Sequence, residues 1–335
     1  MMMHEPLHFI GLRGALAHGA PLAKHTSWRA GGPADTLFAP ADRDDLAAFL
    51  RQLPAAEPLT VLGLGSNTLV RDGGVRGTVI VLHNPGAVLA VADGLIYADA
   101  ALASPKLARF AANRGCAQAE FLAGIPGTVG GALAMNAGCY GGETWRYVAR
   151  VEVVTRDGRF AVRTPADYAI GYRSVRLRAA GPPQGAHGAP SGGSAAAPAA
   201  GVGGHPSAED SPCGDIFTAA WFRFPAGDAA AARARIKDLL ARRIAAQPLS
   251  LPNAGSVFRN PPGDHAARLI ESCGLKGFAR GGARVSEKHA NFIVNPRGAG
   301  LAADIEALIA HVRATVRDRT GVDLEPEVRI VGEQA

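Results

Sequence analysis

A glycine-rich, uncharged stretch between Ala123 and Gly141 constrains this chain more than any other part of its sequence. It reads AGIPGTVGGALAMNAGCYG, with glycine at 124, 127, 130, 131, 138 and 141. Glycine adopts positive φ angles and lets a bulky partner approach the main chain closely. Such a run can direct backbone N–H groups at a phosphate or lie against a flat ring. A tightly turned, buried loop without a ligand is the alternative that this stretch alone leaves open.

A second glycine-rich turn lies upstream, in LTVLGLGSNTLV at 59–70. Its apolar flanks predict a strand, a turn and a second strand, with Gly63, Gly65, Ser66 and Asn67 in the turn. No third glycine follows and no helical pattern begins after the turn, so this is not a Rossmann fingerprint. The turn can offer N–H and side-chain donors to an anion, and an ordinary β-turn is the alternative.

Composition indicates a folded, basic chain. Of the 335 residues, 47% are hydrophobic and 19% are charged, which excludes a disordered protein and allows two or three domains. The net charge of +6 suits anionic ligands, but the lysines and arginines are dispersed and only 6% of the residues are aromatic. A nucleic-acid groove is therefore a weak explanation.

The cysteines and the N-terminus bear on the cellular compartment. None of the cysteines has C-x-x-C spacing, so we expect reduced thiols that bind no metal. The cysteines are Cys116, Cys139, Cys213 and Cys273. The first 20 residues do not have the pattern of a secretory signal, and no run of about 20 apolar residues could span a membrane. We therefore expect a soluble, cytoplasmic protein, monomeric and without nucleic-acid or membrane partners.

Periodicity and turn residues predict an α+β chain without strict β-α-β alternation. Residues 1–20 should form a loose arm or a short helix, and helical spacing follows over 42–53, 228–246 and 301–316. Asp-Gly pairs at 93–94 and 157–158 predict hairpin turns. The final segment, VDLEPEVRIVG, should be a strand in which Glu325, Glu327 and Arg329 share one face.

The segment 180–214 differs in kind from the rest, because Gly, Ala, Pro and Ser dominate it. Such a composition buries too little apolar surface to offset its ordering entropy, so we expect a disordered surface insertion. Around it, the sequence predicts an N-terminal binding half to about residue 225, large enough for a flavin or a nucleotide. A smaller C-terminal half should bring polar residues to the same cleft.

Seven motifs in order match one family. They are TSWRAGGPA (26–34), GLGSNTLV (63–70), GIPGTVGGALAMNAGCYG (124–141), GYRS (171–174), NAGSVFRNP (253–261), SEKHANFIVN (286–295) and LEPEVRIVG (324–332). On these motifs the chain resembles the bacterial UDP-N-acetylenolpyruvoylglucosamine reductases, which make UDP-N-acetylmuramate for peptidoglycan and so serve cell-wall biogenesis, cell shape and division. The insertion 180–214 contains no tyrosine, so the chain is similar to the family form without the tyrosine loop.

The resemblance implies an α+β fold in which a vanillyl-alcohol-oxidase-like (PCMH-type) domain, 21–225, clasps FAD. A substrate-binding domain, 226–335, would follow it. The cofactors would be FAD, bound non-covalently, and NADPH. The FAD contacts carried over from the family are Arg29, Gly31, Gly32, Gly63, Leu64, Gly65, Ser66, Asn67, Gly124, Ile125, Pro126, Gly127, Gly130, Gly131, Asn136, Ala137 and Gly138. The glycine-rich stretches that the residues alone predict as anion and ring cradles are among them.

Three catalytic positions also follow from the resemblance. Arg173 matches the arginine of the Y-R motif, Ser256 the serine of A-G-S and Glu327 the glutamate of E-V-R, with Glu325 as the alternative to Glu327. For substrate binding we expect Tyr172, Asn260, Arg242, Arg243 and Lys288.

The chemistry explains why these residue types are needed. The substrate is an enolpyruvyl ether, and hydride from flavin N5 would attack its terminal CH2 while negative charge develops toward the carboxylate. A guanidinium stabilises that charge, and a positioned hydroxyl such as that of Ser256 can donate the proton that completes the reduction. Glu327 could hydrogen-bond the carboxylate or relay the proton.

Two other classes of protein remain open on the residues. A flavin oxidase of similar fold accounts for the N-terminal half but leaves the A-G-S and E-V-R motifs without a role. A non-catalytic flavin or nucleotide binder would use the same cleft as a sensor.

Overall fold

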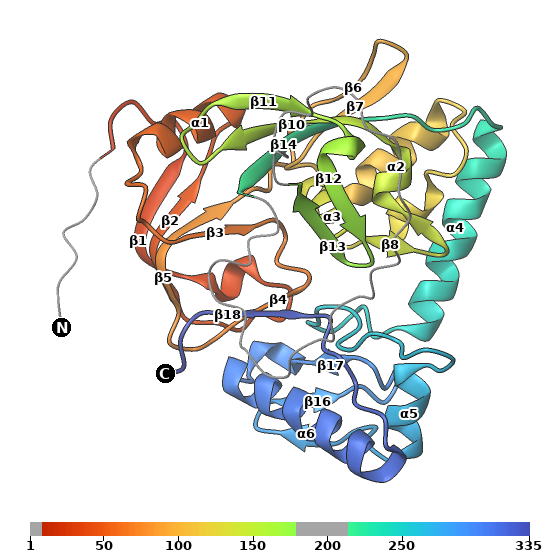
Figure 1. Ribbon diagram of the computed structural model, residues 1–335. Coiled ribbons are helices and arrows are strands. Elements are labelled where there is room, and N and C mark those ends of the chain that lie inside the picture. The colour runs from red at the N-terminus through yellow and green to blue at the C-terminus, as the bar shows by residue number, and fades with distance from the viewer. Residues whose placement is uncertain (1–8, 179–213) are drawn as a thin grey trace, which may run out of the picture.

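The first sheet of the N-terminal half is four-stranded, in the order β1-β2-β5-β3 (Figure 1). The computed structural model describes residues 9–178 and 214–335, so nearly all of the expected insertion lies outside the described residues. The strands are β1 (Ala15–Pro21), β2 (Pro33–Ala39), β3 (Leu59–Leu62) and β5 (Val75–Val81), and helix α1 (Arg43–Gln52) packs on them. The apolar spacing over 42–53 thus correctly predicts α1.

Strand β1 corrects one expectation. Residues 15–20 form no loose arm and no short helix, because Ala15–Pro21 pairs antiparallel with β2 from Ala15↔Ala39 to Pro21↔Pro33. Leu16 on this strand packs against the cluster that contains Phe38 and Phe49. Pairing with a neighbouring strand outweighs the weak apolar pattern of the segment.

The second sheet is five-stranded and antiparallel throughout, in the order β11-β10-β14-β7-β6. Its strands are β6 (Leu89–Ala92), β7 (Leu95–Asp99), β10 (Val148–Thr155), β11 (Phe160–Arg163) and β14 (Asp215–Phe222). The β6–β7 hairpin turns at Asp93-Gly94 and the β10–β11 hairpin at 156–159, which confirms both Asp-Gly predictions. β14 brings the chain back into the sheet centre after the insertion.

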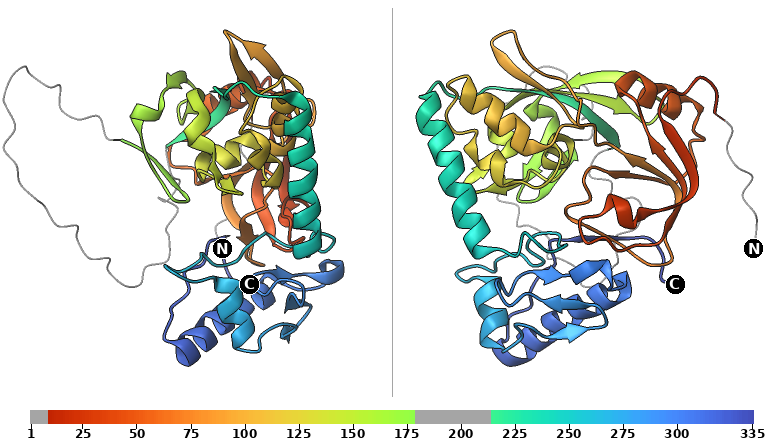
Figure 2. Two further views of the ribbon diagram at one scale, coloured as in Figure 1. Left: turned by 90° about the vertical axis from the view of Figure 1, so that its right-hand side faces the viewer. Right: turned by 180° about the vertical axis from the view of Figure 1, so that it is seen from behind.

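Helices cover this second sheet. They are α2 (Ser104–Asn113), α3 (Val129–Ala134) and the long α4 (Ala229–Ala246), whose Ala232 and Ile236 join the same hydrophobic core. Figure 2 shows α4 running down one side of the molecule to the C-terminal unit. A domain boundary at 225/226 stays a prediction, and the packing of α4 on α2 favours a boundary after this helix.

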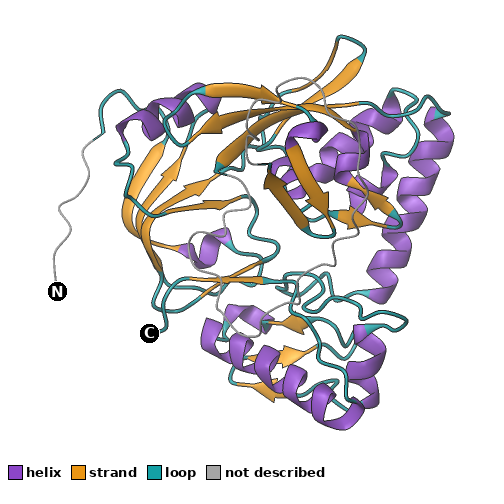
Figure 3. Ribbon diagram, viewed as in Figure 1, coloured by secondary structure: helices purple, strands orange, loops and turns teal. Residues whose placement is uncertain are grey.

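The C-terminal unit is a small α+β layer at the bottom of Figure 3. It contains α5 (Ala266–Ser272), α6 (Ala302–Thr320) and a three-stranded sheet of β15 (Ala279–Arg280), β16 (Ala283–Val285) and β17 (Ile293–Val294). α6 ends at Gly321, which has φ +74° and supplies a left-handed cap.

The two halves are tied together by backbone pairing and by a shared core. β18 (Arg329–Val331) pairs parallel to β4 (Thr68–Val70). Trp28, fully buried, belongs to the C-terminal core and donates its indole N–H to the Ile293 carbonyl at 2.8 Å. The C-terminal unit therefore completes its core with residues of the N-terminal half.

Short elements complete the described chain. Two hairpins, β8 (Gly138–Cys139) with β9 (Gly142–Glu143) and β12 (Tyr168–Gly171) with β13 (Ser174–Leu177), border the site described next. The 3-10 turns are η1 (Leu22–His25), η2 (Glu120–Gly124), η3 (Thr144–Tyr147), η4 (Pro165–Asp167) and η6 (Pro296–Gly298). No described helix is long and apolar enough to cross a lipid bilayer.

Candidate active site

The two glycine-rich segments lie against each other. A Cβ built on Gly63 would be 2.5 Å from Thr128 Oγ1, and one built on Gly127 would be 3.2 Å from Ser66 Oγ. Only glycine at 63 allows the turn after β3 to approach the start of α3 this closely. The segments 63–67 and 124–131 thus form one continuous surface of nearly bare backbone.

The segment 26–32 closes this surface on its other side. A Cβ on Gly65 would lie 2.2 Å from the His25 carbonyl oxygen, and Ser27 donates from both its N–H and its hydroxyl to the Gly65 carbonyl. Arg29 and Gly31 both have positive φ, 57° and 130°. Three of the predicted cofactor segments therefore meet in space.

The predicted catalytic arginine and glutamate form an ion pair. Arg173 Nε lies 2.6 Å from Glu327 Oε1, and the two side chains are only 20% and 10% exposed. Arg173 occupies the two-residue turn of the β12–β13 hairpin, since Gly171 pairs with Ser174. The pair joins this hairpin to the C-terminal segment.

Glu327 is also held through its backbone. Its N–H donates to the Val257 carbonyl at 2.7 Å, next to Ser256, and its carbonyl accepts from Asn67 Nδ2 at 3.1 Å. The predicted cofactor residue Asn67, the loop 253–259 that contains Ser256 (the Ser256 loop) and the E-V-R motif therefore converge at Glu327. Ser256 follows Gly255, whose positive φ of 76° turns the loop.

The segment that carries Glu327 differs from the predicted strand. Regular β-structure begins only at Arg329, because residues 325–327 pair with the Ser256 loop through an isolated bridge, Phe258↔Pro326. Glu325 and Glu327 bind different arginines: Glu325 Oε1 lies 2.9 Å from Arg259 Nη1 and its side chain is 64% exposed. Of the two candidates, Glu327 is the buried one.

Burial sets the protonation of Glu327. Its pKa is raised above the ordinary value by desolvation, against the opposing effects of Arg173 and, more weakly, of Arg259. Both guanidiniums also lie near the Tyr172 ring, 5.6 Å and 5.5 Å from its centroid. Tyr172 thus lies between two cations that each have a glutamate partner.

A cavity of about 490 Å³ opens beside this pair. Five predicted site residues line it, namely Asn136, Gly138, Tyr172, Arg173 and Asn260. Ser256 and Glu327 are not among its lining residues. The other lining residues are Cys139, Tyr140, Gly141, Gly142, Glu143 and Arg146.

The side chain of Asn136 holds neighbouring protein segments together. It is 4% exposed, accepts from the Trp145 N–H at 3.1 Å, and donates from Nδ2 to Glu143 Oε2 and to the Gly171 carbonyl. Gly171 directly precedes the Tyr172-Arg173 turn. Asn136 therefore fixes the hairpin tip to the glycine-rich segment.

The four remaining predicted substrate contacts divide into two groups. Arg243 donates to the Gly124 carbonyl, which places it against the glycine-rich segment, and Asn260 Oδ1 accepts from the Ala266 N–H at the start of α5. Arg242 instead forms an exposed pair with Asp238, and Lys288 Nζ donates to the Ile244 carbonyl at the end of α4. Neither Arg242 nor Lys288 lines the cavity, so substrate binding by them stays a prediction.

Sequence reasoning missed the Arg259–Glu325 pair and the cavity residues Tyr140 and Arg146. Arg259 lies inside the matched motif NAGSVFRNP, so its place in that motif was a signal. Tyr140 has φ +52° and donates its hydroxyl to the Leu239 carbonyl of α4 at 3.0 Å, which nothing in the local sequence indicates. Cys116, Cys139 and Cys273 are free thiols, whereas Cys213 lies outside the described residues.

Comparison with known proteins agrees with this site. The model of an FAD binding domain matches residues 34–162, and that of the C-terminal domain of UDP-N-acetylenolpyruvoylglucosamine reductase matches residues 247–331. The chain is similar to the reductases of Nitrosospira multiformis, at 57% identity over 98% of this chain and 92% of the relative, and of Alkalilimnicola ehrlichii, at 51% identity over 96% of each. The crystal structure of the Thermus caldophilus reductase superposes with a TM-score of 0.70, at 30% identity over 96% of this chain and 100% of that one.

Fold and site together define an α+β flavoprotein with an FAD-binding unit and a C-terminal domain. Within that class the chain belongs to the UDP-N-acetylenolpyruvoylglucosamine reductase family. It is an FAD-dependent oxidoreductase of peptidoglycan precursor synthesis that acts on a small UDP-sugar, and the family uses FAD and NADPH.

The residues present fit FAD. Gly63 and Gly127 let the segments 63–67 and 124–131 approach each other closely, and glycine-rich turns of this kind can direct backbone N–H groups at a diphosphate. Among the described residues there is no cluster of three or more potential metal ligands.

Proposed function

We propose that this protein reduces the enolpyruvyl group of UDP-N-acetylglucosamine enolpyruvate to a lactyl ether, with NADPH as hydride source and Arg173, Ser256 and Glu327 as catalytic residues. The observation that carries the proposal is the buried Arg173–Glu327 pair, held on one side by Asn67 and on the other by the Ser256 loop. This pair adjoins a cavity of about 490 Å³ beside the glycine-rich cradle.

Each residue has a distinct task in the reaction. FAD held by the segments 63–67 and 124–131 would supply the hydride, which would convert the terminal CH2 of the substrate into a methyl group. Arg173 faces the cavity and stabilises the charge that develops on the substrate carboxylate. The Ser256 hydroxyl donates the proton to the adjacent carbon, which completes the saturated ether.

Glu327 orients Arg173, and its carboxyl proton can form a hydrogen bond with the substrate. Because burial raises its pKa, Glu327 stays protonated to a higher pH than an ordinary glutamate. In the protonated form it can donate a hydrogen bond to the substrate carboxylate, and in the ionised form it fixes the guanidinium.

The same proposal covers location and assembly. A sugar nucleotide and NADPH are both found in the cytoplasm, so we place the protein there. We also propose that the protein is a monomer. Sedimentation of the holoenzyme at two concentrations tests the monomer.

An anaerobic absorbance experiment tests the reaction. NADPH should bleach the flavin band, and UDP-N-acetylglucosamine enolpyruvate should then restore it, because one flavin carries both half-reactions. The Ser256→Ala variant should bleach normally and recover at least about a hundredfold more slowly. If the band never bleaches, the assignment of NADPH is wrong. If Ser256→Ala recovers at the wild-type rate, the proton comes from another group.

A further inference from the structure

The motif SEKHANFIVN (286–295) has no task in the catalytic assignments above, apart from the predicted contact of Lys288. Its first residues form a tight turn that Ser286 closes. The Ser286 N–H donates to the Phe292 carbonyl at 2.8 Å. The Ser286 hydroxyl oxygen accepts from the Lys288 N–H at 3.1 Å. This turn fixes the direction of Asn291, which lies within it.

Asn291 binds the backbone of the Ser256 loop with both ends of its side chain. It is 4% exposed, its Oδ1 accepts from the Phe258 N–H at 2.9 Å, and its Nδ2 donates to the Phe258 carbonyl at 2.8 Å. The backbone carbonyl of Asn291 also accepts from the Val257 N–H at 2.9 Å. An amide carries a donor and an acceptor on one planar group, so asparagine can pair with a peptide as a neighbouring strand does. Three hydrogen bonds from one residue thus hold the two residues that follow Ser256.

The same loop is also bound by the segment that carries Glu327. The Glu327 N–H donates to the Val257 carbonyl at 2.7 Å. The Ser256 hydroxyl itself forms no hydrogen bond with any other described residue. Its position is therefore set by the loop backbone, which Asn291 and the Glu327 segment hold together.

We propose that Asn291 is a positioning residue for the protonation step: by holding Val257 and Phe258, it keeps the Ser256 hydroxyl directed at the carbon that receives the proton. Asn291 does not touch the substrate and acts only through Ser256. Displacement of a reacting group by about 1 Å can lower a rate about a hundredfold, so the hold on the loop matters for the chemistry. This role rests on Ser256 being the proton donor of the proposed function.

Single-turnover kinetics on the holoenzyme test this role. The flavin is reduced anaerobically with NADPH and then mixed with UDP-N-acetylglucosamine enolpyruvate. Asn291→Ala should lower the rate constant of flavin reoxidation about tenfold, because the proton donor is displaced. Flavin reduction by NADPH should stay within about twofold of the wild type, because that step needs no proton from Ser256. Asn291→Asp keeps the shape and removes the amide donor, and it is the second variant, with the same expected loss, if Asn291→Ala does not fold.

A double-variant cycle separates positioning from general stability. Ser256→Ala combined with Asn291→Ala should reoxidise within about twofold of Ser256→Ala alone, because no hydroxyl is left to position. A residue that only maintained the fold would lower the rate by the same factor in both backgrounds.

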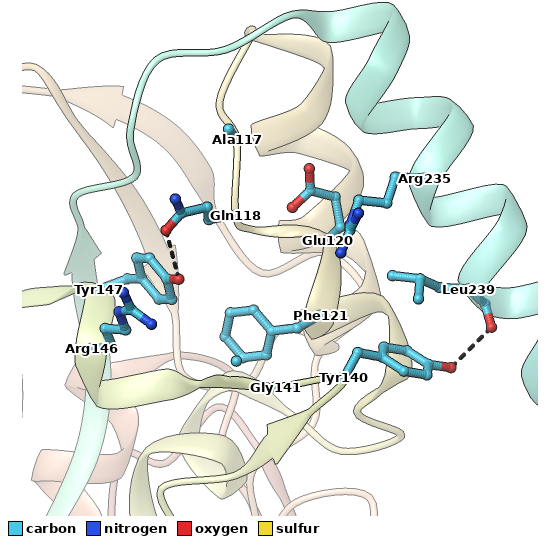
Figure 4. Close-up of a pocket in the computed structure, with 11 residues that line it drawn as sticks. Ala117, Gln118, Glu120, Phe121, Tyr140, Gly141, Arg146, Tyr147, Arg235 and Leu239 are labelled. Carbon is cyan, nitrogen blue, oxygen red and sulfur yellow. Dashed lines mark hydrogen bonds between the residues drawn. The ribbon is translucent and has the colours of Figure 1, made fainter.

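Asn295→Ala is the matched control, since Asn295 is a fully buried asparagine of the same motif. Its side chain binds the Trp28 and Gly300 carbonyls and the Gly300 N–H rather than the Ser256 loop. The variant should lose thermal stability, but the ratio of its two rate constants should stay within about twofold of the wild type. Tyr147→Phe removes the hydrogen bond to Gln118 Oε1 in the N-terminal half (Figure 4) and should leave the ratio unchanged as well.

Wild-type reoxidation in Asn291→Ala would overturn the inference. So would a full recurrence of its loss in the Ser256→Ala background, or the same loss of reoxidation alone in Asn295→Ala. If Ser256→Ala itself reoxidises at the wild-type rate, the proposed proton donor fails before Asn291 is considered.

Discussion

Arg173 has a backbone conformation that is rare for a residue with a side chain. Its φ is +54°, in the left-handed region that usually costs a non-glycine residue about 1–2 kcal/mol. The cost is offset by the ion pair with Glu327 and by the paired strands on both sides of the turn. The strained backbone at Arg173 therefore indicates that the reaction requires the guanidinium to point toward Glu327 and the cavity.

Removing that guanidinium should affect only one half-reaction. Arg173→Met should lower kcat/KM for the enolpyruvyl substrate by about 10²- to 10³-fold, because transition-state charge loses its stabilisation. Flavin reduction by NADPH should be unchanged. Stopped-flow absorbance measures both steps, and an equal loss in both would mean that Arg173 mainly maintains the fold. The double variant Arg173→Met, Glu327→Gln should remain inactive while regaining stability, because no unpaired charge is left buried.

The raised pKa of Glu327 predicts a pH dependence of stability. The folded protein holds this proton more tightly than the unfolded chain does, so it binds more protons between the ordinary glutamate pKa and the raised one. In that window the wild-type free energy of unfolding should fall as pH rises, relative to Glu327→Gln, which cannot titrate. Urea unfolding across the window measures the difference.

Glu325→Gln is the control for that experiment. Its side chain is 64% exposed, so removing its charge should leave the pH dependence close to that of the wild type. The assignment of the titration to Glu327 would be contradicted if Glu327→Gln and the wild type changed in parallel with pH.

At the scale of elements, the β12–β13 hairpin depends on Asn136. Asn136→Ala should lower the free energy of unfolding by about 2 kcal/mol or more, because the buried Trp145 N–H loses its partner and the hydrogen bond to the Gly171 carbonyl is lost as well. Thermal unfolding measures the loss. Asn84→Ala, at an exposed turn where the side chain accepts from the Gly86 N–H and donates to the Ala41 carbonyl at 3.5 Å, should lose well under half as much. Equal losses would show that the hairpin is held by something else.

The elements show what the sequence could predict. The hairpins at 93–94 and 157–158 and helices α1, α4 and α6 follow from local turn residues and apolar spacing. The strand β1 and the short β18 do not, because their boundaries depend on partners far away in sequence, β2 for the first and β4 and the Ser256 loop for the second. The local sequence pattern of a strand does not indicate which other segment the strand pairs with.

The same limit applies to the site. Arg173, Ser256 and Glu327 could be proposed because each lies in a matched motif. The Arg259–Glu325 pair and the packing of Tyr140 against α4 depend on residues that are 66 and 99 positions apart in the chain, which no short motif contains. Those contacts emerge only in the folded chain, because each joins segments that are far apart in the sequence.

At the scale of the whole molecule, the shared core predicts cooperative unfolding. Trp28, Ala30 and Leu69 of the N-terminal half are buried in the C-terminal core. Calorimetry should therefore give one thermal transition, with equal calorimetric and van't Hoff enthalpies. Trp28→Ala should split it into two by leaving a cavity and an unpaired Ile293 carbonyl. Two transitions in the wild type would contradict this.

The peptide that carries Glu327 has a consequence for recombination among relatives. Its N–H is bound by the Ser256 loop and its carbonyl by Asn67, so two segments far apart in sequence position one catalytic side chain. A chimera that exchanges residues 247–335 between two parents also exchanges one half of that clamp. Active hybrids should therefore need residues 63–70 and 253–332 from the same parent. These two segments, although far apart in the sequence, must be exchanged together.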